Sequence, residues 1–309
     1  MNKVVIFGGS GFVGQALVKE LLSHGFRVKI ISRDIHKISF FKTYAGVDFI
    51  ALQQWDYQCQ DQLDTILKGS HSVINLVGIL AQKKKGDFIK FHSEFPEILA
   101  QKCHELDVEN FVHISALAIE NAKNSQYAKS KLQGETSIRQ HFPDATILRP
   151  SIIFGPRDNF FNKFAKMAKT LPALPLINDG KTKFQPIYVG DVAKLIVQSI
   201  LHKKHQGQTY EIGGNKVYTF KTLLEFTGSY LGKDELRFSN LNFAQAKTLA
   251  GFLEIFTKNI LTRDQVELLK TDNIVQDDRF KKAFSINLKA VEEIVPNYIS
   301  NTKLQEYIH

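Results

Sequence analysis

A glycine-rich segment near the start of the chain constrains the fold more than any other feature. It reads Gly8-Gly9-Ser10-Gly11-Phe12-Val13-Gly14, follows the apolar run 4–7, and precedes apolar residues at helical spacing. A strand, a glycine turn and a helix in this order are typical of a site for the pyrophosphate of a dinucleotide, because glycines allow close approach and the first helical N–H groups hold the anion. The alternative is a glycine turn with no ligand. The residues predicted to bind the cofactor here are Gly8, Ser10, Gly11, Phe12, Val13 and Gly14.

Strand and helix patterns alternate through the first half of the chain. Strands are predicted near 3–7, 26–31, 47–52, 72–77, 110–115 and 145–149, and helices near 12–24, 35–45, 60–68, 87–106 and 126–141. Alternation of this kind predicts an α/β fold, a Rossmann-type doubly wound parallel sheet with helices on both faces. The length of 309 residues suggests about two domains. We predict a nucleotide-binding domain over 1–150 and a smaller C-terminal α/β lobe over 151–309, with strands returning near 185–188 and 208–212.

The composition is that of a globular protein, with 43% hydrophobic and 23% charged residues. Apolar runs are too short for a transmembrane helix or a signal peptide, and Cys59 and Cys103 suggest no disulfide framework. We therefore expect a cytoplasmic protein without a metal site, with a peripheral position at the inner face of a membrane left open. The net charge of +9 fits a phosphate-bearing cofactor, an anionic membrane surface or a solvated lysine-rich surface. Nucleic acid is not expected as a partner, because no motif supports it.

The residues after the second predicted strand bear on which cofactor binds. An acidic side chain there accepts a hydrogen bond from the ribose 2′-hydroxyl of NAD, whereas a nearby arginine favours the 2′-phosphate of NADP. This chain has Ser32 and then Arg33, which predicts NADP(H) over NAD(H). Asp34 has two alternatives, a ribose contact with NAD or a cap on the following helix. Asp56, after the third strand, is a further predicted cofactor contact, with ordinary turn chemistry as its alternative.

A second motif carries the chemistry of proton transfer. Tyr127 and Lys131 lie four residues apart and so share one face of a predicted helix. A lysine ammonium near a phenol lowers the pKa of that phenol, and the lysine can also hydrogen bond the nicotinamide ribose. Ser115 ends the fifth strand with a small hydroxyl. Tyr127, Lys131 and Ser115 are therefore the predicted catalytic residues, and Tyr127 and Lys131 are also predicted cofactor contacts.

Together these motifs resemble the extended short-chain dehydrogenase/reductase superfamily, whose members include NAD-dependent epimerases and dehydratases. The resemblance also rests on 148–156, 185–193 and 210–214, and it covers most of the chain. It implies that Leu76, Val77, Gly78, Pro150 and Ile152 line the cofactor site.

Four stretches narrow the resemblance to the atypical branch that contains the 39 kDa accessory subunit of respiratory complex I and its bacterial relatives. They are 75–80, 127–135, 157–164 and 261–273. In that branch NADPH is held as a bound nucleotide and the catalytic tetrad is incomplete. Here the tetrad's hydroxyl position falls at Ala116, unless Ser115 serves, and its asparagine position falls at His92. His92 is then either a packing residue or part of a proton relay.

The resemblance leaves two main hypotheses of function. The first is an NADP(H)-holding accessory or assembly protein linked to a membrane-bound NADH:ubiquinone oxidoreductase or to quinone metabolism. The second is an active NADPH-dependent reductase or epimerase that acts through Tyr127 and Lys131 on a hydrophobic carbonyl or quinone-related substrate. Redox or nitrogen sensing through nucleotide occupancy is a third alternative, with no sequence feature of its own.

Two apolar stripes in the second half leave their roles open. One predicts core packing or a hydrophobic substrate wall, and consists of Phe160, Phe161, Phe164, Met167 and Leu171. The other predicts packing on the lobe or docking on a partner or membrane, and consists of Phe243, Ala246, Ala250, Leu253, Phe256 and Ile260.

Overall fold

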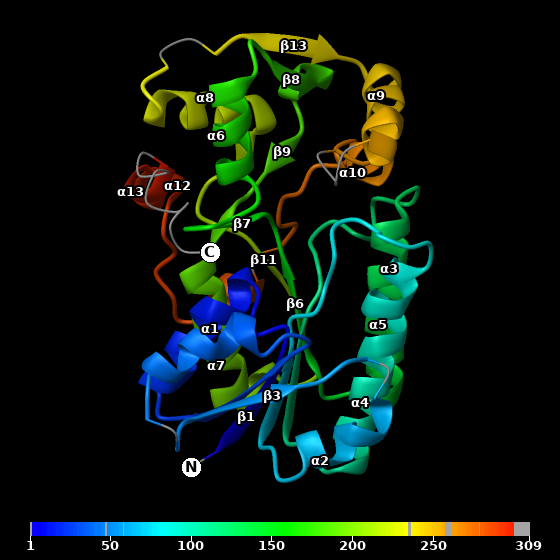
Figure 1. Ribbon diagram of the computed structural model, residues 1–309, viewed down its shortest axis with the longest axis vertical. Coiled ribbons are helices and arrows are strands. Elements are labelled where there is room, and N and C mark those ends of the chain that lie inside the picture. Colours follow the sequence, from blue (N-terminus) through cyan, green and yellow to red (C-terminus); the bar gives the residue numbers. More distant parts are fainter. Residues whose placement is uncertain are drawn as a thin grey trace.

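The computed structural model describes residues 2–46, 48–57, 59–233, 236–256, 261–277 and 279–299. Within them, seven parallel strands form the central sheet in the order β11-β6-β5-β4-β1-β2-β3 (Figure 1). Their bounds are β1 Lys3–Phe7, β2 Arg27–Ser32, β3 Ile50–Gln54, β4 Ser72–Asn75, β5 Asn110–Ile114, β6 Thr146–Pro150 and β11 Thr209–Ile212. The strand order reverses between β1 and β4, and in open α/β sheets ligands bind at such a switch point.

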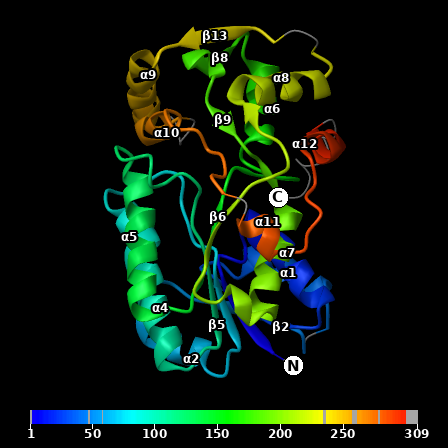
Figure 2. The same cartoon turned by 180° about the vertical axis from the view of Figure 1, so that it is seen from behind.

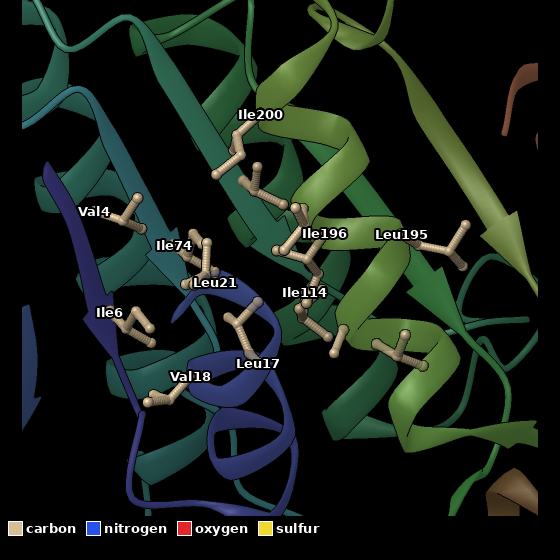
Figure 3. Packing of buried hydrophobic residues seen from close by; sticks show 14 of the residues in the cluster. Val4, Ile6, Leu17, Val18, Leu21, Ile74, Ile114, Leu195, Ile196 and Ile200 are labelled. Atoms are coloured by element: carbon tan, nitrogen blue, oxygen red, sulfur yellow. The ribbon is translucent and has the colours of Figure 1, made fainter. Parts of the chain in front are cut away.

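Helices cover both faces of this sheet. On one face lie α1 (Phe12–Ser23) and α7 (Val189–Leu201), and on the other lie α2 (Leu63–Leu67), α4 (Phe95–Glu105) and α5 (Gln126–His141). Alternate side chains of β1 belong to two different cores, because successive side chains of a strand point to opposite faces of the sheet. Val4 and Ile6 pack under α1 and α7 (Figure 3), whereas Val5 and Phe7 pack under α2 and α4. The predicted doubly wound Rossmann-type α/β fold is therefore confirmed.

A second group of elements forms the upper lobe in Figure 1. Its core gathers Phe154, Phe161, Phe184, Phe220 and Tyr298 among other buried side chains. Its helices are α6 Phe161–Thr170, α8 Phe220–Tyr230, α9 Phe243–Phe256, α10 Arg263–Leu268, α12 Val291–Ile294 and α13 Pro296–Ile299. Within the described ranges, three two-stranded sheets pair β7 Ile153–Phe154 with β10 Ile187–Tyr188, β9 Lys183–Phe184 with β12 Tyr218–Thr219, and β8 Leu174–Ile177 with β13 Phe238–Leu241.

The chain after residue 150 also returns to the sheet. β11 extends the sheet beyond β6, α7 packs on α1, and α11 (Arg279–Ala283) lies beside α7 (Figure 2). Phe280, Phe284 and Leu288 are buried in the same core as Val4 and Ile6. The predicted return near 208–212 is thus found in β11. The predicted return near 185–188 is wrong, since β10 pairs with β7 and not with the central sheet.

Two elements near the N-terminus differ clearly from the sequence prediction. The third strand is β3 at Ile50–Gln54 and not 47–52, because the chain first turns at Gly46, whose carbonyl accepts a hydrogen bond from the Phe49 N–H (3.0 Å). The helix expected at 35–45 is the 3₁₀ helix η1 (His36–Thr43). The Ser39 and Thr43 hydroxyls donate to carbonyls three residues back, which competes with α-helical pairing.

The helix predicted at 87–106 contains a π-helical segment. It begins as α3 (Asp87–Ile89), passes through η3 (Lys90–Glu94) and continues as α4. Pro96, in the first turn of α4, has no N–H to donate to the carbonyl of His92. That carbonyl instead faces Gly134 on α5, where a Cβ atom would clash with it. Gly134 is therefore a close-packing residue, and this packing fixes α5 against η3.

The apolar stripe on α6 packs mostly as core. Phe161 is fully buried, Phe160, Phe164 and Met167 pack partly buried against the lobe core, and Leu171 is 43% exposed. On α9, Ala246 and Ala250 are buried, so this stripe also packs on the lobe. The side chain of Phe256 and all of Ile260 lie outside the described residues. Among the helices described, none is both long and apolar enough to span a bilayer.

We expect Leu17→Ala to lower the free energy of unfolding by about 2–5 kcal/mol, the usual cost of emptying a leucine-sized core site. Leu17 is fully buried between α1 and the sheet (Figure 3). Urea unfolding followed by circular dichroism measures the change. The matched control is Leu201→Ala at the end of α7, where the side chain is 46% exposed. Equal midpoints for the two variants would contradict this description of the core.

Candidate functional site

The glycine turn between β1 and α1 is crowded by backbone on two sides. Gly8 has φ +80°, and a Cβ atom there would lie 3.0 Å from the Leu76 carbonyl carbon. A Cβ atom at Gly14 would lie 2.5 Å from the Gly9 carbonyl carbon. Neither position accepts a side chain without a shift of the backbone, so both glycines are required by close approach. Gly8 thereby lies against the chain just after β4, and Gly14 packs the first turn of α1 against Gly9.

The N-terminal end of α1 carries no side-chain cap. Its N-cap residue is Gly11, and no described side chain accepts a hydrogen bond from the first-turn N–H groups. Phe12, Val13 and Gly14 supply those groups, and the helix dipole adds partial positive charge. A glycine cradle in front of an uncapped helix end fits the pyrophosphate of a dinucleotide. All six residues predicted from this segment, including Ser10, thus lie in the glycine turn or in the first turn of α1.

Arg157 also reaches this turn, from the loop after β7. Its guanidinium donates a hydrogen bond to the Gln15 side-chain oxygen on α1. The neighbouring Gly155 lies against Phe12, since a Cβ atom there would be 3.5 Å from the ring. The sequence marked Arg157 only as part of a family-like segment. Because the two residues are 142 positions apart, no local sequence pattern predicts this contact.

The predicted adenosine contacts lie together at the ends of β2 and β3. The Ser32 hydroxyl donates to the Asp34 carbonyl (2.9 Å), and the Ser32 carbonyl accepts from the Trp55 N–H (2.9 Å) next to Asp56. Arg33 is exposed, and no described residue forms a hydrogen bond or ion pair with it. Asp34 accepts from the His36 N–H (3.0 Å) at the start of η1, as the capping alternative predicted. Arg33 and Asp56 are thus both exposed beside the buried Ser32.

Lys131 lies at the other end of the site. Its ammonium is buried and donates to the Ile114 carbonyl at the end of β5 (3.1 Å). A Cβ atom at Gly78 would lie 3.3 Å from this ammonium, so α5 and the loop after β4 meet here. Burial lowers the pKa of Lys131 to about 8, and the Glu135 carboxylate opposes that shift. Gly78 and Lys131, far apart in the sequence, are brought together.

The remaining predicted cofactor contacts follow the ends of β4 and β6. The Leu76 N–H donates to the Phe7 carbonyl (2.9 Å), which keeps Leu76 and Val77 beside the glycine turn. The Pro150 carbonyl accepts from the Leu117 N–H (2.9 Å), and the Ile152 carbonyl accepts from Ile187 (2.9 Å). Because all these strands are parallel, their carboxyl ends form one edge of the sheet. The predicted cofactor residues therefore share that edge.

Tyr127 does not have the environment that the sequence predicted. Burial raises the pKa of its phenol above the usual value, and the Asp264 carboxylate raises that pKa further. Lys131 donates to the main chain, and no described residue hydrogen bonds the Tyr127 hydroxyl. The expected lowering of the phenol pKa by Lys131 is wrong, because burial and the Asp264 carboxylate both raise that pKa. Tyr127 is therefore held as a neutral phenol that can donate a hydrogen bond.

The Ser115 hydroxyl, which the sequence predicted to be catalytic, forms no described hydrogen bond with Tyr127 or Lys131. The Ser115 hydroxyl oxygen is buried and has no hydrogen-bond partner among the described residues. Ala116 packs against the small apolar cluster that Tyr127 also contacts, formed by Ile119, Ala122 and Ala128. Ala116, which packs against the same cluster as Tyr127, thus offers a methyl group where the family's catalytic hydroxyl is expected.

His92 is buried and uses both ring nitrogens within the fold. Its Nε2 accepts from the Ile79 N–H (3.0 Å), so its Nδ1 carries the proton and donates to the Ser130 hydroxyl (2.9 Å). Burial, reinforced by the Lys131 charge, lowers the pKa of His92 to about 2. A neutral imidazole with both nitrogens bonded fits the packing alternative and not a proton relay.

The segment 261–273 ties the loops around this end of the site together. Asp264 binds the start of α5, and Gln265 donates to the Leu80 carbonyl (3.4 Å). At its other end, Asn273 donates to the Leu117 carbonyl (3.0 Å) and accepts from the Ser151 hydroxyl (2.7 Å). The sequence indicated this segment only by family resemblance, and these contacts were not predicted.

The fold and this edge of glycines and strand ends can now be compared with known proteins. The family described as NAD dependent epimerase/dehydratase matches residues 4–213. The chain belongs to this family. The match covers the central sheet and the part of the upper lobe inserted before β11.

Several known proteins are similar in sequence to this chain. The chain is 34% identical over 223 residues to mitochondrial NADH dehydrogenase (ubiquinone) 1 alpha subcomplex subunit 9 of Mus musculus, over 72% of this chain and 59% of that subunit. It is 28% identical over 288 residues to the subunit of the same name in Arabidopsis thaliana, over 89% of this chain and 71% of that subunit. A ceramide reductase of Caulobacter vibrioides is 27% identical over 63% of this chain and 59% of that enzyme. The resemblance to the complex I branch is thus confirmed.

Solved structures share the fold at low sequence identity. The dTDP-glucose 4,6-dehydratase DesIV of Streptomyces venezuelae, solved with NAD bound, superposes with a TM-score of 0.77 at 15% identity and covers 99% of this chain and 97% of its own. The UDP-glucuronic acid 4-epimerase of Bacillus cereus gives 0.75 at 19% identity, with 97% and 99% covered. At these identities the likeness shows the fold of both lobes and nothing finer.

Lys131→Met should change how stability depends on pH. The folded chain holds the Lys131 pKa at about 8 against an ordinary value of 10.5, so the unfolded chain binds more protons between these pH values. Below pH 8 the folded parent bears the full free-energy cost of burying the charged Lys131 ammonium. This cost disappears as the pH rises to 10.5, so the free energy of unfolding of the parent increases across this range. The variant's stability relative to the parent should therefore fall by about 3 kcal/mol across this window.

Urea unfolding at several pH values from 7 to 10.5 measures this difference. The control is Lys129→Met, at an exposed position on the same helix. A difference between parent and Lys131→Met that does not vary with pH would show that the ammonium is not buried as described.

Proposed function

We propose that this protein binds NADP(H) at the carboxyl edge of its central sheet and holds it as a resident nucleotide. The support is the glycine cradle, the uncapped start of α1, and the membership of a family described as NAD dependent. Preference for the phosphorylated cofactor rests on the neutral, buried Ser32 and the exposed, unpaired Arg33. The solved relatives named above bind NAD, so this preference is the finer part of the proposal.

Most of the predicted cofactor residues have a role in this proposal. The N–H groups of 12–14 hold the pyrophosphate, while Arg33 pairs with the 2′-phosphate and Asp56 borders the adenosine half. Lys131 and the neutral Tyr127 donate hydrogen bonds to the nicotinamide ribose. Leu76, Val77, Gly78, Pro150 and Ile152 form the walls along the strand ends. When bound, the nicotinamide group supplies hydride chemistry.

We further propose an accessory or assembly role linked to a membrane-bound NADH:ubiquinone oxidoreductase. The observation that carries it is an intact nucleotide cradle beside an incomplete catalytic set. Ala116 stands at the position of the hydroxyl, and both ring nitrogens of His92 are hydrogen bonded within the fold. A set lacking its carbonyl-polarising donor loses orders of magnitude in rate. Relatives named as complex I subunits point the same way, over part of their length.

The second candidate is an NADPH-dependent reductase or epimerase for a hydrophobic carbonyl or quinone-related substrate. The observation in its favour is the Ser115 hydroxyl, which is buried and unpartnered near the end of β5, the strand whose last carbonyl binds Lys131. A substrate carbonyl would give that hydroxyl a partner. The ceramide reductase relative is consistent with a lipid-like substrate.

The rate at which NADPH leaves the purified protein separates the two functions. Turnover needs the oxidised cofactor to leave, so a resident nucleotide should survive gel filtration and dissociate over hours. Exchange within seconds, together with an NADPH oxidation that Tyr127→Phe abolishes, would favour the reductase and overturn the accessory role.

Arg33→Ala should weaken NADPH binding by about 10- to 100-fold and leave NADH binding unchanged, because only NADPH carries the phosphate that the guanidinium pairs with. Fluorescence titration of both nucleotides measures this. Lys42→Ala, exposed in η1, is the charge-matched control. Parent protein that binds NADH as tightly as NADPH would overturn the preference for NADP(H).

A further inference from the structure

The helix that carries Tyr127 and Lys131 begins against a carboxylate from the other lobe. In Figures 1 and 2, α10 lies over the end of α5 at which the helix starts. Asp264, in the first turn of α10, accepts hydrogen bonds from the Ser125 hydroxyl (2.8 Å), the Gln126 N–H (2.6 Å) and the Tyr127 N–H (3.3 Å). Three donors at the start of α5 are therefore satisfied by a residue almost 140 positions away.

This arrangement is more than an ordinary helix cap. Ser125 already caps α5 itself, since its hydroxyl oxygen accepts from the Ala128 N–H (3.1 Å). The Asp264 carboxylate binds the N–H groups that Ser125 leaves open, and its charge is favourable at the positive end of the helix dipole. Because the Tyr127 N–H is one of its donors, the carboxylate fixes the backbone of Tyr127 directly.

Asp264 is itself held firmly in place. Thr262 and Gln265 form a reciprocal capping box at the start of α10, and Arg263 pairs with Glu254 on α9 (2.9 Å). Gln265 adds a hydrogen bond to the Leu80 carbonyl, in the loop that follows Gly78. The carboxylate is thus anchored to the upper lobe and to the loop beside Lys131.

We propose that Asp264 is a positioning residue, which sets Tyr127 on α5 for its contact with the nicotinamide ribose and so makes that half of the site depend on the upper lobe. This inference rests on the proposed function, since it concerns the same nucleotide. The other end of the site, at α1 and Arg33, has no described contact with Asp264. Loss of the carboxylate should therefore act on the nicotinamide half alone.

The test compares two ligands on the full chain. NADPH contains both halves of the site's ligand, whereas 2′,5′-ADP lacks the nicotinamide half. Asp264→Ala should weaken NADPH binding on the order of tenfold, because the free energy of a helix cap corresponds to about that change in a dissociation constant. The same substitution should change 2′,5′-ADP binding less than about twofold. In a Tyr127→Phe background, Asp264→Ala should add little, because residues that act through one another are not additive.

Asp272→Ala is the matched control. Asp272 lies in the same segment and accepts a backbone N–H from Lys183 (2.8 Å), but it has no described contact with α5. The control should leave both ligands unchanged. Equal losses of NADPH and 2′,5′-ADP in Asp264→Ala would reduce Asp264 to a structural residue, and no loss of either would also overturn the inference.

Amide hydrogen exchange without nucleotide separates this inference from the proposed function. Asp264→Ala should speed exchange in the first turn of α5, and Asp272→Ala should not. If the parent binds neither ligand, the proposed function fails, while faster exchange at 125–128 still supports positioning by Asp264. Unchanged exchange there overturns the inference whatever the nucleotide results are.

Discussion

The backbone contact between the first turn of α1 and the glycine turn determines most of what the site can do. Gly14 approaches the Gly9 carbonyl at a distance that excludes a side chain, and Gly8 does the same against Leu76. This contact presses α1 onto β1, so that α1 can bury Leu17 and Leu21 with α7. It also leaves the uncapped start of the helix at the edge where the parallel strands end. The packing of α1 and the shape of the candidate ligand site thus both depend on glycine at positions 8 and 14.

Much of the fold could be predicted from the sequence because its signals are local. The apolar run of β1 and the apolar residues at helical spacing in α1 are patterns of neighbouring residues, and both elements lie where the sequence predicted them. The 3₁₀ helix η1 and the π-helical η3 were not predicted, since they depend on hydroxyls that compete for carbonyls and on a proline after His92. The sequence prediction assigned β10 to the central sheet, whereas it pairs with β7. Two apolar residues carry no information about which strand they pair with.

The candidate site divides in the same way. Residue types and spacing were enough to propose Tyr127, Lys131 and the glycine turn, and these do lie along one edge. Spacing did not predict the environment of these residues. Burial raises the pKa of Tyr127 and lowers the pKa of Lys131, and the buried Ser115 hydroxyl has no hydrogen-bond partner among the described residues. The contacts of Asp264 with α5 and of Arg157 with Gln15 join residues about 140 positions apart, so they could be found only in the folded chain.

The return of the chain to the central sheet has a consequence for how the molecule is made. β11 and α7 complete one face of the sheet, and Phe280, Phe284 and Leu288 close the core over them. A nascent chain that has emerged only to residue 150 therefore exposes a half-covered parallel sheet, and it stays exposed while the upper lobe is synthesised. Such intermediates are slow to mature and prone to aggregation. A fragment cut after β6 would retain this unfinished surface, so the nucleotide-binding half is not a separable unit of folding.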